Sequence, residues 1–424
     1  MWHGRWARDD VLTMSTANSP SRAGRSVDEH RAAIAGLMPP PRADALPLQA
    51  CAGLVLAADV NADVDLPPFD NSAMDGYAVR AEDVAAAGER PVTLPVAADI
   101  PAGRTDVPAL QPGTAHRIMT GAPMPAGADT VVKVEDTDAG TERVTIHAAP
   151  PRGTSVRHAG EDIRRGTTAL TAGTRLGPAQ LALAAAIGRG ELPVYLPPKV
   201  LIVATGSELV VPPAPLRHGQ IYESNSVYLA TALGSLGCQV DVLRAVADDV
   251  DEFMRLLTPR AAEADLVVTT GGVSAGAYEV VKDALTARGV EFTKVAMQPG
   301  GPQGCGRIGS TPIVTLPGNP VSVAVSFEVF LRPALLKLLG HRQTERQRVR
   351  ARLLEALRAP AGKRQFRRGY FTWDEGSVTG TVGPRGGPGS HLLAAFSQAN
   401  CLIDIPEEAT ELAEGDLVDV LLLG

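Results

Sequence analysis

Residues 265–276 read DLVVTTGGVSAG, and this stretch decides the fold. Its first half is apolar and β-branched, which is typical of a buried strand, so we expect a strand over residues 265–270. The glycines and small residues that follow predict a tight loop, which leads into a helix expected over residues 277–288. A strand that is apolar on both faces is characteristic of a parallel sheet covered by helices.

The same alternation of strand and helix extends in both directions from this stretch. Apolar runs predict further strands, and segments with helical periodicity lie between them. The expected strands are 199–205, 239–245, 265–270, 291–297 and 313–316, and the expected helices are 224–236, 251–262, 277–288 and 321–339. This order predicts a doubly wound, mostly parallel sheet, so the fold class is multidomain α/β.

Short segments with many turns flank the α/β region on both sides, and they predict small mixed and β domains before it and a C-terminal β barrel after it. A helix is expected over residues 26–38, ahead of three prolines, and a short helix over 46–60. The expected division is a disordered tail over 1–25 (or an over-extended start, with Met14 as the true first residue), a linker domain over 26–66 plus 157–196, a small β domain over 67–156, the α/β domain over 197–342 and the barrel over 343–424.

The composition excludes several classes of protein. The 424 residues carry a formal net charge of -7 and only 4% are aromatic, whereas a nucleic-acid binder needs a basic face and stacking side chains. The four cysteines include no Cys-x-x-Cys pair, so neither a zinc site nor a disulfide framework is expected. Because no apolar run could span a membrane and no secretory signal is present, we expect a cytoplasmic protein.

The loops after the strands are the first candidates for a site, because open parallel sheets bind ligands at the carboxyl ends of their strands. The Gly-Gly loop would offer backbone amides and the hydroxyl groups of Thr269, Thr270 and Ser274 to an anion. The alternative is a tight turn with small residues for packing, and we favour the anion site. The loop 317–320, Pro-Gly-Asn-Pro, could be simple helix-entry geometry, but we expect it to form another wall of the same pocket.

Carboxylates gather near the same edge of the sheet. Oxygen ligands without His or Cys suit Mg²⁺, which binds one or two carboxylates together with substrate phosphates. The alternative is that these acids cap helices; this is the better interpretation for Asp249 and Asp251, and for Glu208 and Asp248 the two are evenly matched. The predicted metal ligands are Glu208, Asp248 and Glu279.

Six strings in the chain, taken in order, closely resemble the MoeA family of molybdopterin molybdenumtransferases, to which the C-terminal domain of gephyrin also belongs. The resemblance extends from about Val27 to Gly424. The strings are PPFDNSAMDGYA (67–78), IMTGAPMP (118–125), GEDI (160–163), ATGSEL (204–209), GGVSAG (271–276) and LPGNPVS (316–322).

The resemblance implies a homodimer whose active cleft lies between subunits, with the molybdopterin-binding α/β domain of one subunit facing the small β domain of the other. It implies molybdate and adenylyl-molybdopterin as substrates, Mg²⁺ as cofactor, release of AMP, and molybdopterin adenylyltransferase and molybdoenzymes or their chaperones as partners. The implied catalytic residues are Asp75, Thr120 and Asp162. The implied ligand-binding residues are Thr205, Gly206, Glu208, Gly271, Gly272, Ser274, Gly276, Lys282, Pro317, Gly318, Asn319 and Pro320.

The sequence departs from the family pattern at four positions. Ser207 stands where many members have an acid, and Glu279 where Asp is common, while Gln298 and Gly301 occupy positions that are often Lys. Losing two cations should weaken anion binding, since a charged contact to an oxyanion is stronger than a neutral one. Either other basic groups compensate, such as Lys282, Arg368 or His391, or the substrate differs.

Three rival functions belong to different classes. The first is a molybdopterin adenylyltransferase, although such enzymes are typically the sheet domain alone. The second is a non-catalytic, gephyrin-like scaffold, which would release no AMP. The third is a paralogue that handles tungstate, an oxyanion that sequence cannot separate from molybdate.

Overall fold

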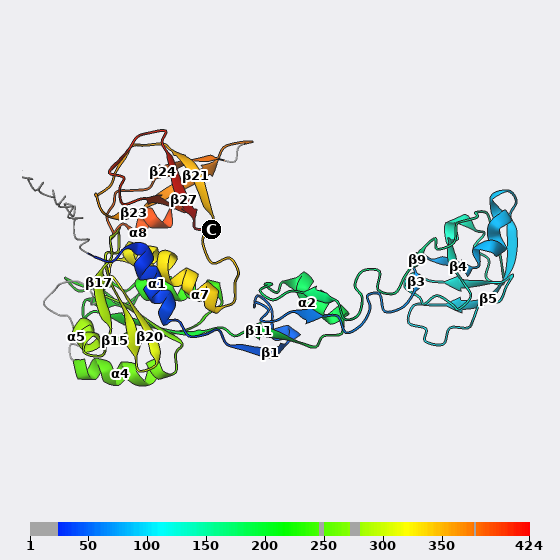
Figure 1. The fold of residues 1–424 in the computed structure, drawn as a ribbon, viewed down its shortest axis with the longest axis horizontal. Helices are drawn as coiled ribbons and strands as arrows, with labels where there is room; N and C mark the ends of the chain where they lie inside the picture. The colour runs from blue at the N-terminus through cyan, green and yellow to red at the C-terminus, as the bar shows by residue number, and fades with distance from the viewer. Residues whose placement is uncertain (1–23, 246–249, 272–279, 377–378) are drawn as a thin grey trace, which may run out of the picture. The chain divides into compact units, whose positions relative to one another are not determined.

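The computed structural model describes residues 24–245, 250–271, 280–376 and 379–424 (Figure 1). The described chain forms two compact units. Unit 1 comprises residues 24–39, 198–335 and 344–424, and unit 2 comprises residues 40–197 and 336–343. Each unit is described by itself.

The centre of unit 1 is a six-stranded sheet with the order β15-β12-β16-β20-β19-β17. Strands β15, β12, β16 and β20 are parallel, and β19 pairs antiparallel with both β20 and β17. The bounds are β12 Lys199–Thr205, β15 Gln239–Ala245, β16 Leu266–Thr270, β17 Glu291–Lys294, β19 Pro302–Ile308 and β20 Thr311–Leu316. The predicted doubly wound, mostly parallel sheet is therefore confirmed.

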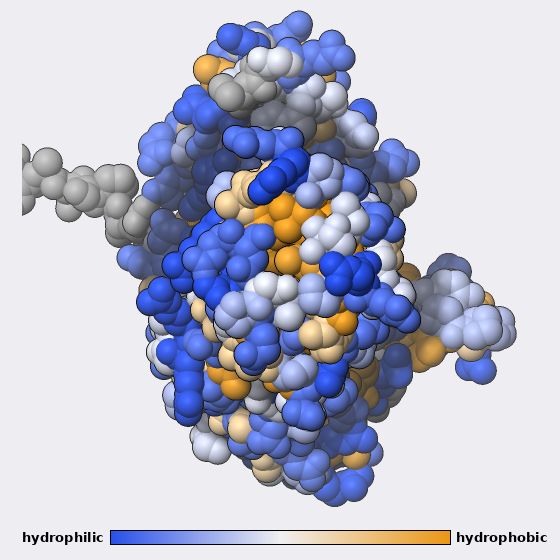
Figure 2. Space-filling view, turned by 90° about the vertical axis from the view of Figure 1, so that its right-hand side faces the viewer, coloured by the Kyte–Doolittle hydropathy of each residue, from blue (hydrophilic) through white to orange (hydrophobic). Residues whose placement is uncertain are grey.

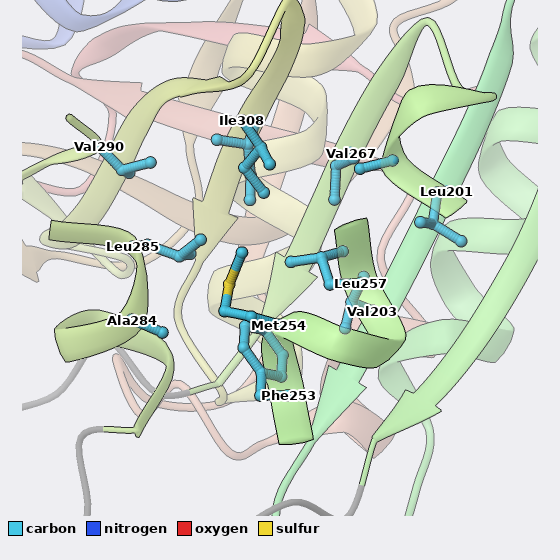
Figure 3. Packing of buried hydrophobic residues seen from close by; sticks show 12 residues of the cluster. Leu201, Val203, Phe253, Met254, Leu257, Val267, Ala284, Leu285, Val290 and Ile308 are labelled. Atoms are coloured by element: carbon cyan, nitrogen blue, oxygen red, sulfur yellow. The ribbon is translucent and has the colours of Figure 1, made fainter. Parts of the chain in front are cut away.

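Helices cover both faces of this sheet. On one face, α4 (Val250–Ala262) and α5 (Val280–Thr286) bury an apolar cluster that includes Leu201, Val203 and Val267 (Figure 3). A second pair of helices, α3 (Asn225–Leu236) and α6 (Pro320–Ser326), also packs on the sheet. These two helices contact each other and the strands β12, β15 and β20. The helix continues from α6 through η4 (Phe327–Leu331) into α7 (Arg332–Leu338). Because side chains alternate along a strand, both faces of the apolar strands are buried.

The expected strand over 291–297 is divided in two. Its first part is β17, and its end, β18 (Met297–Gln298), leaves the sheet to pair in parallel with β23 of the C-terminal barrel. Strand β19 was not expected, because its sequence PQGCGRI has glycines in place of an apolar alternation.

The C-terminal part of unit 1 is a closed barrel. Strands follow the order β23-β24-β21-β27-β25, and β25 pairs again with β23. The bounds are β21 Arg348–Leu353, β22 Leu357–Arg358, β23 Arg364–Trp373, β24 Gly380–Pro384, α8 Leu393–Ser397, β25 Cys401–Ile405, β26 Glu411–Leu412 and β27 Leu417–Leu422. The predicted barrel is therefore confirmed.

Unit 2 has two parts, each with its own apolar core. One part combines the pairs β1/β11 and β2/β10 with α2, and the other is a five-stranded sheet with the order β7-β4-β6-β5-β8, beside the pair β3/β9. The bounds are β1 Ala43–Pro47, η1 Leu48–Ala50, β2 Val60–Asn61, β3 Asn71–Ser72, β4 Gly76–Val79, η2 Ala81–Gly88, β5 Val92–Ile100, β6 Ala115–Ile118, β7 Thr130–Lys133, η3 Val134–Asp136, β8 Arg143–Ile146, β9 Val156–Arg157, β10 Thr168–Leu170, α2 Pro178–Ala186 and β11 Glu191–Tyr195.

Two sequence predictions need correction or restatement. The expected helix over 46–60 is wrong, because this segment forms the end of β1, the short η1 and then turns that lead to β2. The predicted helix over 26–38 is confirmed as α1 (Val27–Leu37), which begins with a capping box of Ser26 and Glu29. However, α1 contacts η4 and β19 of unit 1, whereas we expected residues 26–66 to lie together in a linker domain. The five-part division stays a proposal, with α1 assigned to unit 1.

Among the described residues, no helix is both long and apolar enough to cross a membrane. Figure 2 shows a face that is mostly hydrophilic, with apolar side chains gathered in a small area near its centre.

Candidate functional site

The carboxyl ends of three parallel strands meet at one edge of the unit 1 sheet. Gly271 directly follows β16, and its amide donates to the Leu316 carbonyl at the end of β20 (3.2 Å). A Cβ added to Gly271 would lie 3.0 Å from the Thr205 carbonyl, and one added to Gly318 would lie 3.6 Å from the Gly271 Cα. The loops of Thr205, Gly271 and Gly318 therefore form one continuous surface, as the sequence predicted for a parallel sheet.

Glu208 lies on the same edge, and the backbone ahead of it is shaped for its side chain. Gly206 has a φ of +151°, and a Cβ at this position would lie only 2.5 Å from the Glu208 carboxylate. The carboxylate therefore folds back over the end of β12, in space that only glycine leaves open. Glu208 is exposed, so its oxygens are available to a ligand.

Several expected ligand groups are not where a ligand could reach them, or lie outside the described residues. Thr269 and Thr270 lie inside β16 and are 0% and 2% exposed, so their proposed role as hydroxyl donors to an anion is wrong. Outside the described residues lie Gly272, Ser274, Gly276, Asp248 and Glu279. Among the residues that are described, no three acidic, His or Cys side chains form a metal-binding cluster.

A pocket of about 470 Å³ opens beside the Pro317–Asn319 loop. Its other walls are the segment 294–302, which contains Gln298 and Gly301, and two parts of the barrel, Lys363 and the loop 388–391. Of the residues that the structure describes, three basic side chains line it (Lys294, Lys363 and His391) and no acidic side chain does. The pocket is therefore suited to an anion.

The basic groups expected to compensate for Gln298 and Gly301 behave differently from one another. His391 lines the pocket, but Lys282 lies on α5 and does not line it. The guanidinium of Arg368 is 4% exposed and donates to the carbonyls of Arg385, Gly387 and Gly389, so it fixes the barrel loop from inside. Burial, followed by the nearby Arg367, lowers the pKa of Arg368. Lys363 was missed because nothing in the sequence shows which barrel residues reach the sheet. Lys294 was missed because it was expected inside a continuous strand over 291–297, whereas β17 ends at this residue.

The Pro317–Pro320 loop is held from two sides. The side-chain amide of Asn225, the first residue of α3, donates to the Gly318 carbonyl (2.7 Å). The Val321 amide, just after the loop, donates to the Ser390 carbonyl of the barrel (3.1 Å). Asn225 therefore positions a wall of the pocket without lining it.

We expect the substitution Asn225→Ala to lower turnover about tenfold, because small displacements of a positioned binding loop are costly for reaction rate. The free energy of unfolding should fall by only about 1 kcal/mol, the value of one hydrogen bond. The rate of the AMP-releasing reaction that the family resemblance implies, and thermal unfolding of the variant, measure the two effects. Asn61→Ala, which removes a side-chain hydrogen bond to Thr168 in unit 2, is the matched control. An equal loss of activity in both variants would contradict the positioning role of Asn225.

In unit 2, Asp75 and Thr120 form one polar group. Both the backbone amide and the hydroxyl of Thr120 donate to the same Asp75 oxygen, at 2.7 and 2.8 Å. These bonds, the backbone one first, lower the pKa of Asp75 from its ordinary 3.8. The carboxylate is exposed and stays ionised, so its second oxygen can act on a ligand.

The loops of this group are brought together by pairing of two strings that are far apart in the chain. The Ser72 amide donates to the Ala122 carbonyl, the Met124 amide donates to the Asp70 carbonyl, and the Gly121 amide donates to the Ser72 carbonyl. A Cβ at Gly76 would overlap the Val132 carbonyl of β7, so glycine is required for this close approach. The sequence connected these two strings only through the resemblance to the MoeA family.

Asp162 lies in the same unit. Its amide donates to the Leu66 carbonyl (3.0 Å), and the neighbouring Gly160 amide donates to Pro67 (2.9 Å), so its loop is attached to the start of the 67–78 string. The Asp162 side chain is exposed.

Three family models match the chain in order. They are the MoeA N-terminal region (domain I and II) over residues 25–188, a probable molybdopterin binding domain over 201–337, and the MoeA C-terminal region (domain IV) over 350–423.

Curated and solved proteins give the same result. Molybdopterin molybdenumtransferase 2 of Mycobacterium tuberculosis is 52% identical over 404 residues, covering 93% of this chain and 99% of its own length. A molybdopterin molybdenumtransferase of Haemophilus influenzae is 34% identical, with 93% and 98% covered. The crystal structure of a molybdopterin biosynthesis MoeA protein from Pyrococcus horikoshii superposes with a TM-score of 0.80 at 31% identity, covering 94% of this chain and 99% of that one.

Proposed function

The chain belongs to the MoeA family, and we infer from this that it is a molybdopterin molybdenumtransferase of molybdenum cofactor biosynthesis. The reaction inserts molybdate into adenylyl-molybdopterin and releases AMP. The observation that carries this function is the 52% identity to molybdopterin molybdenumtransferase 2 over 93% of the chain. A molybdopterin adenylyltransferase is disfavoured, because the chain also matches the MoeA N-terminal and C-terminal regions.

The sheet edge is the proposed binding surface for the phosphates of adenylyl-molybdopterin. Thr205, Gly271 and Gly318 bring backbone and small side chains together there, so a ligand can approach the main chain closely. Gly272, Ser274, Gly276 and Lys282 extend this surface in the proposal, as do Pro317, Asn319 and Pro320. Cleavage of the phosphoanhydride expels AMP, which is a good leaving group. The protein therefore need only orient the attacking oxygen, from molybdate or water, and stabilise charge on the departing AMP.

We propose Mg²⁺ as the cofactor, held by Glu208 together with Asp248 and Glu279. Support comes from the exposed Glu208 carboxylate at the sheet edge and from the space that Gly206 leaves for it. When bound, the ion would neutralise charge on the leaving phosphate. Oxygen ligands of this kind are those that Mg²⁺ prefers.

We also propose that the chain acts as a homodimer, in which Asp75, Thr120 and Asp162 of one subunit face the sheet edge of its partner. Exposed apolar side chains support an assembly of this kind, because large apolar side chains on a protein surface often mark a site where another protein binds. They include Val211, Ile221 and Tyr222, in the segment that follows β12, and Phe69 and Met74, in the string that carries Asp75.

One experiment tests both the reaction and the shared cleft. Wild-type protein, supplied with adenylyl-molybdopterin, Mg²⁺ and molybdate, should release AMP. At a Mg²⁺ concentration that only just saturates the wild type, Asp75→Asn and Glu208→Gln subunits should each lose most of their activity. Their random mixture should regain about a quarter of the wild-type rate, since half of the dimers would contain one intact cleft. An inactive mixture would contradict the shared cleft, and an inactive wild type would contradict the function.

The remaining proposals concern the surroundings of the enzyme. The cytoplasm is its expected location, and a molybdopterin adenylyltransferase would supply its substrate. Molybdoenzymes or their chaperones would receive the product. Tungstate is the competing oxyanion to include in activity measurements, and a gephyrin-like scaffold without activity would release no AMP.

A further inference from the structure

The anion pocket of unit 1 has an unusual donor at Gln298, a position that is often Lys in the MoeA family. Gln298 lies in β18, which pairs in parallel with the start of β23, so that Gln298 and Gln365 are direct neighbours. The Gln365 side-chain amide donates to Gln298 Oε1 (2.8 Å). Because this bond occupies the oxygen of Gln298, the NH₂ group is the end of the side chain that remains for the pocket.

Gln365 can hold this orientation because it is itself fixed. It is 1% exposed, and its backbone lies in the closed barrel, between β18 and Ile405 of β25. Its own Oε1 has no hydrogen-bond partner among the described residues, so it can accept from a water or from a hydroxyl on a ligand. With Gln365 Nε2 donating to Gln298 Oε1, the Gln298 side chain is held by a buried partner and its NH₂ group can donate to a ligand.

The positive charge of the pocket comes from other positions. Gly301 presents no side chain, and the nearest atoms to a Cβ there are the carbonyls of Val295 (3.4 Å) and Met297 (3.6 Å), so the position is open. Lys363, from the turn before β23, is half-buried and lines the pocket from the barrel, and the exposed Lys294 lines it from the end of β17. The pocket therefore combines charged side chains with a neutral donor.

We propose that Gln298, oriented by Gln365, is a neutral hydrogen-bond donor to a tetrahedral dianion in this pocket, and that Lys363 supplies charge from the barrel. The proposal deepens the function proposed above, since the dianion is either free molybdate or the terminal phosphate of the pterin. Gln365 is a positioning residue, because it acts only through Gln298. A neutral donor binds a dianion more weakly than an ammonium group does, so the pocket binds the dianion less tightly with Gln298 than it would with a lysine at this position.

Titration calorimetry of the full-length protein with molybdate, and separately with inorganic phosphate, tests the proposal. Gln298→Lys should tighten binding of the preferred dianion about fivefold, and Gln365→Leu should weaken it about threefold. In the Gln298→Lys background, Gln365→Leu should have little effect, because an ammonium group donates in any orientation. Lys363→Gln should weaken binding and reduce its dependence on salt. Lys199→Gln, at the opposite edge of the sheet, should change neither.

Two results would overturn the proposal: no tightening in Gln298→Lys, or an equal loss from Gln365→Leu in both backgrounds, which would mark a merely structural role. The absence of measurable binding of either anion to wild type and Gln298→Lys would also overturn it. Thermal unfolding shows whether each variant is folded. AMP release by the wild type is a separate measurement, so failure of the transferase function and failure of the amide pair can be told apart.

Discussion

Replacing Asp75 by Asn is expected to lower AMP release about 100-fold or more, while the protein keeps its fold. The Asn oxygen can still accept the two hydrogen bonds from Thr120, so the loops should remain paired. What is lost is the negative charge on the second, exposed oxygen. Removing one preorganised electrostatic group from an active site typically costs about 10²- to 10³-fold in rate. Single-turnover AMP release, with thermal unfolding alongside, measures both parts of the expectation.

The pKa of Asp75 adds a second, independent readout. Because the Thr120 hydrogen bonds hold this pKa below the ordinary 3.8, the carboxylate stays ionised as the pH falls towards that value and is neutralised only below it. Asp75 should therefore contribute no acid limb to the rate profile above about pH 4. Asp138→Asn is the matched control, because Asp138 is also exposed and also has its pKa lowered, first by a backbone bond from Thr145. Near wild-type turnover in Asp75→Asn would remove Asp75 from the mechanism.

The α/β region could be predicted from the sequence because its signals are local. Strands such as β12 and β16 are apolar over most of their length, and the helices between them have a clear apolar side. Strand β19 carries no such signal, since PQGCGRI is held in the sheet by its pairing with β20 and β17. Its place depends on neighbours that a one-dimensional pattern does not show.

The wrong helix over 46–60 has a different cause. Apolar residues at helical spacing, such as Leu48, Cys51 and Val55, do occur in this segment. However, Pro47 cannot donate a backbone hydrogen bond and Gly53 adopts a φ of +80°. The apolar side chains instead pack against α2 and β11, in the core of the linker part of unit 2. Packing, rather than local periodicity, decides this segment.

The sequence predicted those site residues whose location follows from the order of the parallel strands. It did not predict contacts between residues that only the tertiary fold brings together. Gly271 and Gly318 were expected at one edge because parallel strands end there. The bond between Asp75 and Thr120 joins residues 45 positions apart, and Gln298 and Gln365 are 67 apart. Only the pairing of strands and loops in the folded protein brings these partners together. The family resemblance could therefore name Asp75 and Thr120, but the sequence did not show that their side chains are hydrogen-bonded.

Glu208→Gln is expected to raise the Mg²⁺ concentration needed for half-maximal AMP release roughly tenfold or more. Even the loss of a residue that only hydrogen-bonds to a metal ligand costs about 10- to 100-fold in metal affinity. The folded-back position of this side chain over Gly206 needs only its size, which the glutamine side chain retains, so the loop should keep its shape.

The side-chain amide introduced by Glu208→Gln would offer one neutral oxygen in place of a charged carboxylate, and Mg²⁺ discriminates strongly between the two. Excess Mg²⁺ should therefore restore part of the rate, whereas an effect on substrate binding alone would not respond to the metal. Glu263→Gln, which changes an exposed acid at the amino edge of the same sheet, provides the control and should leave the Mg²⁺ requirement unchanged. An unaltered Mg²⁺ requirement in Glu208→Gln would mean that Glu208 shapes the loop after β12 without holding the metal.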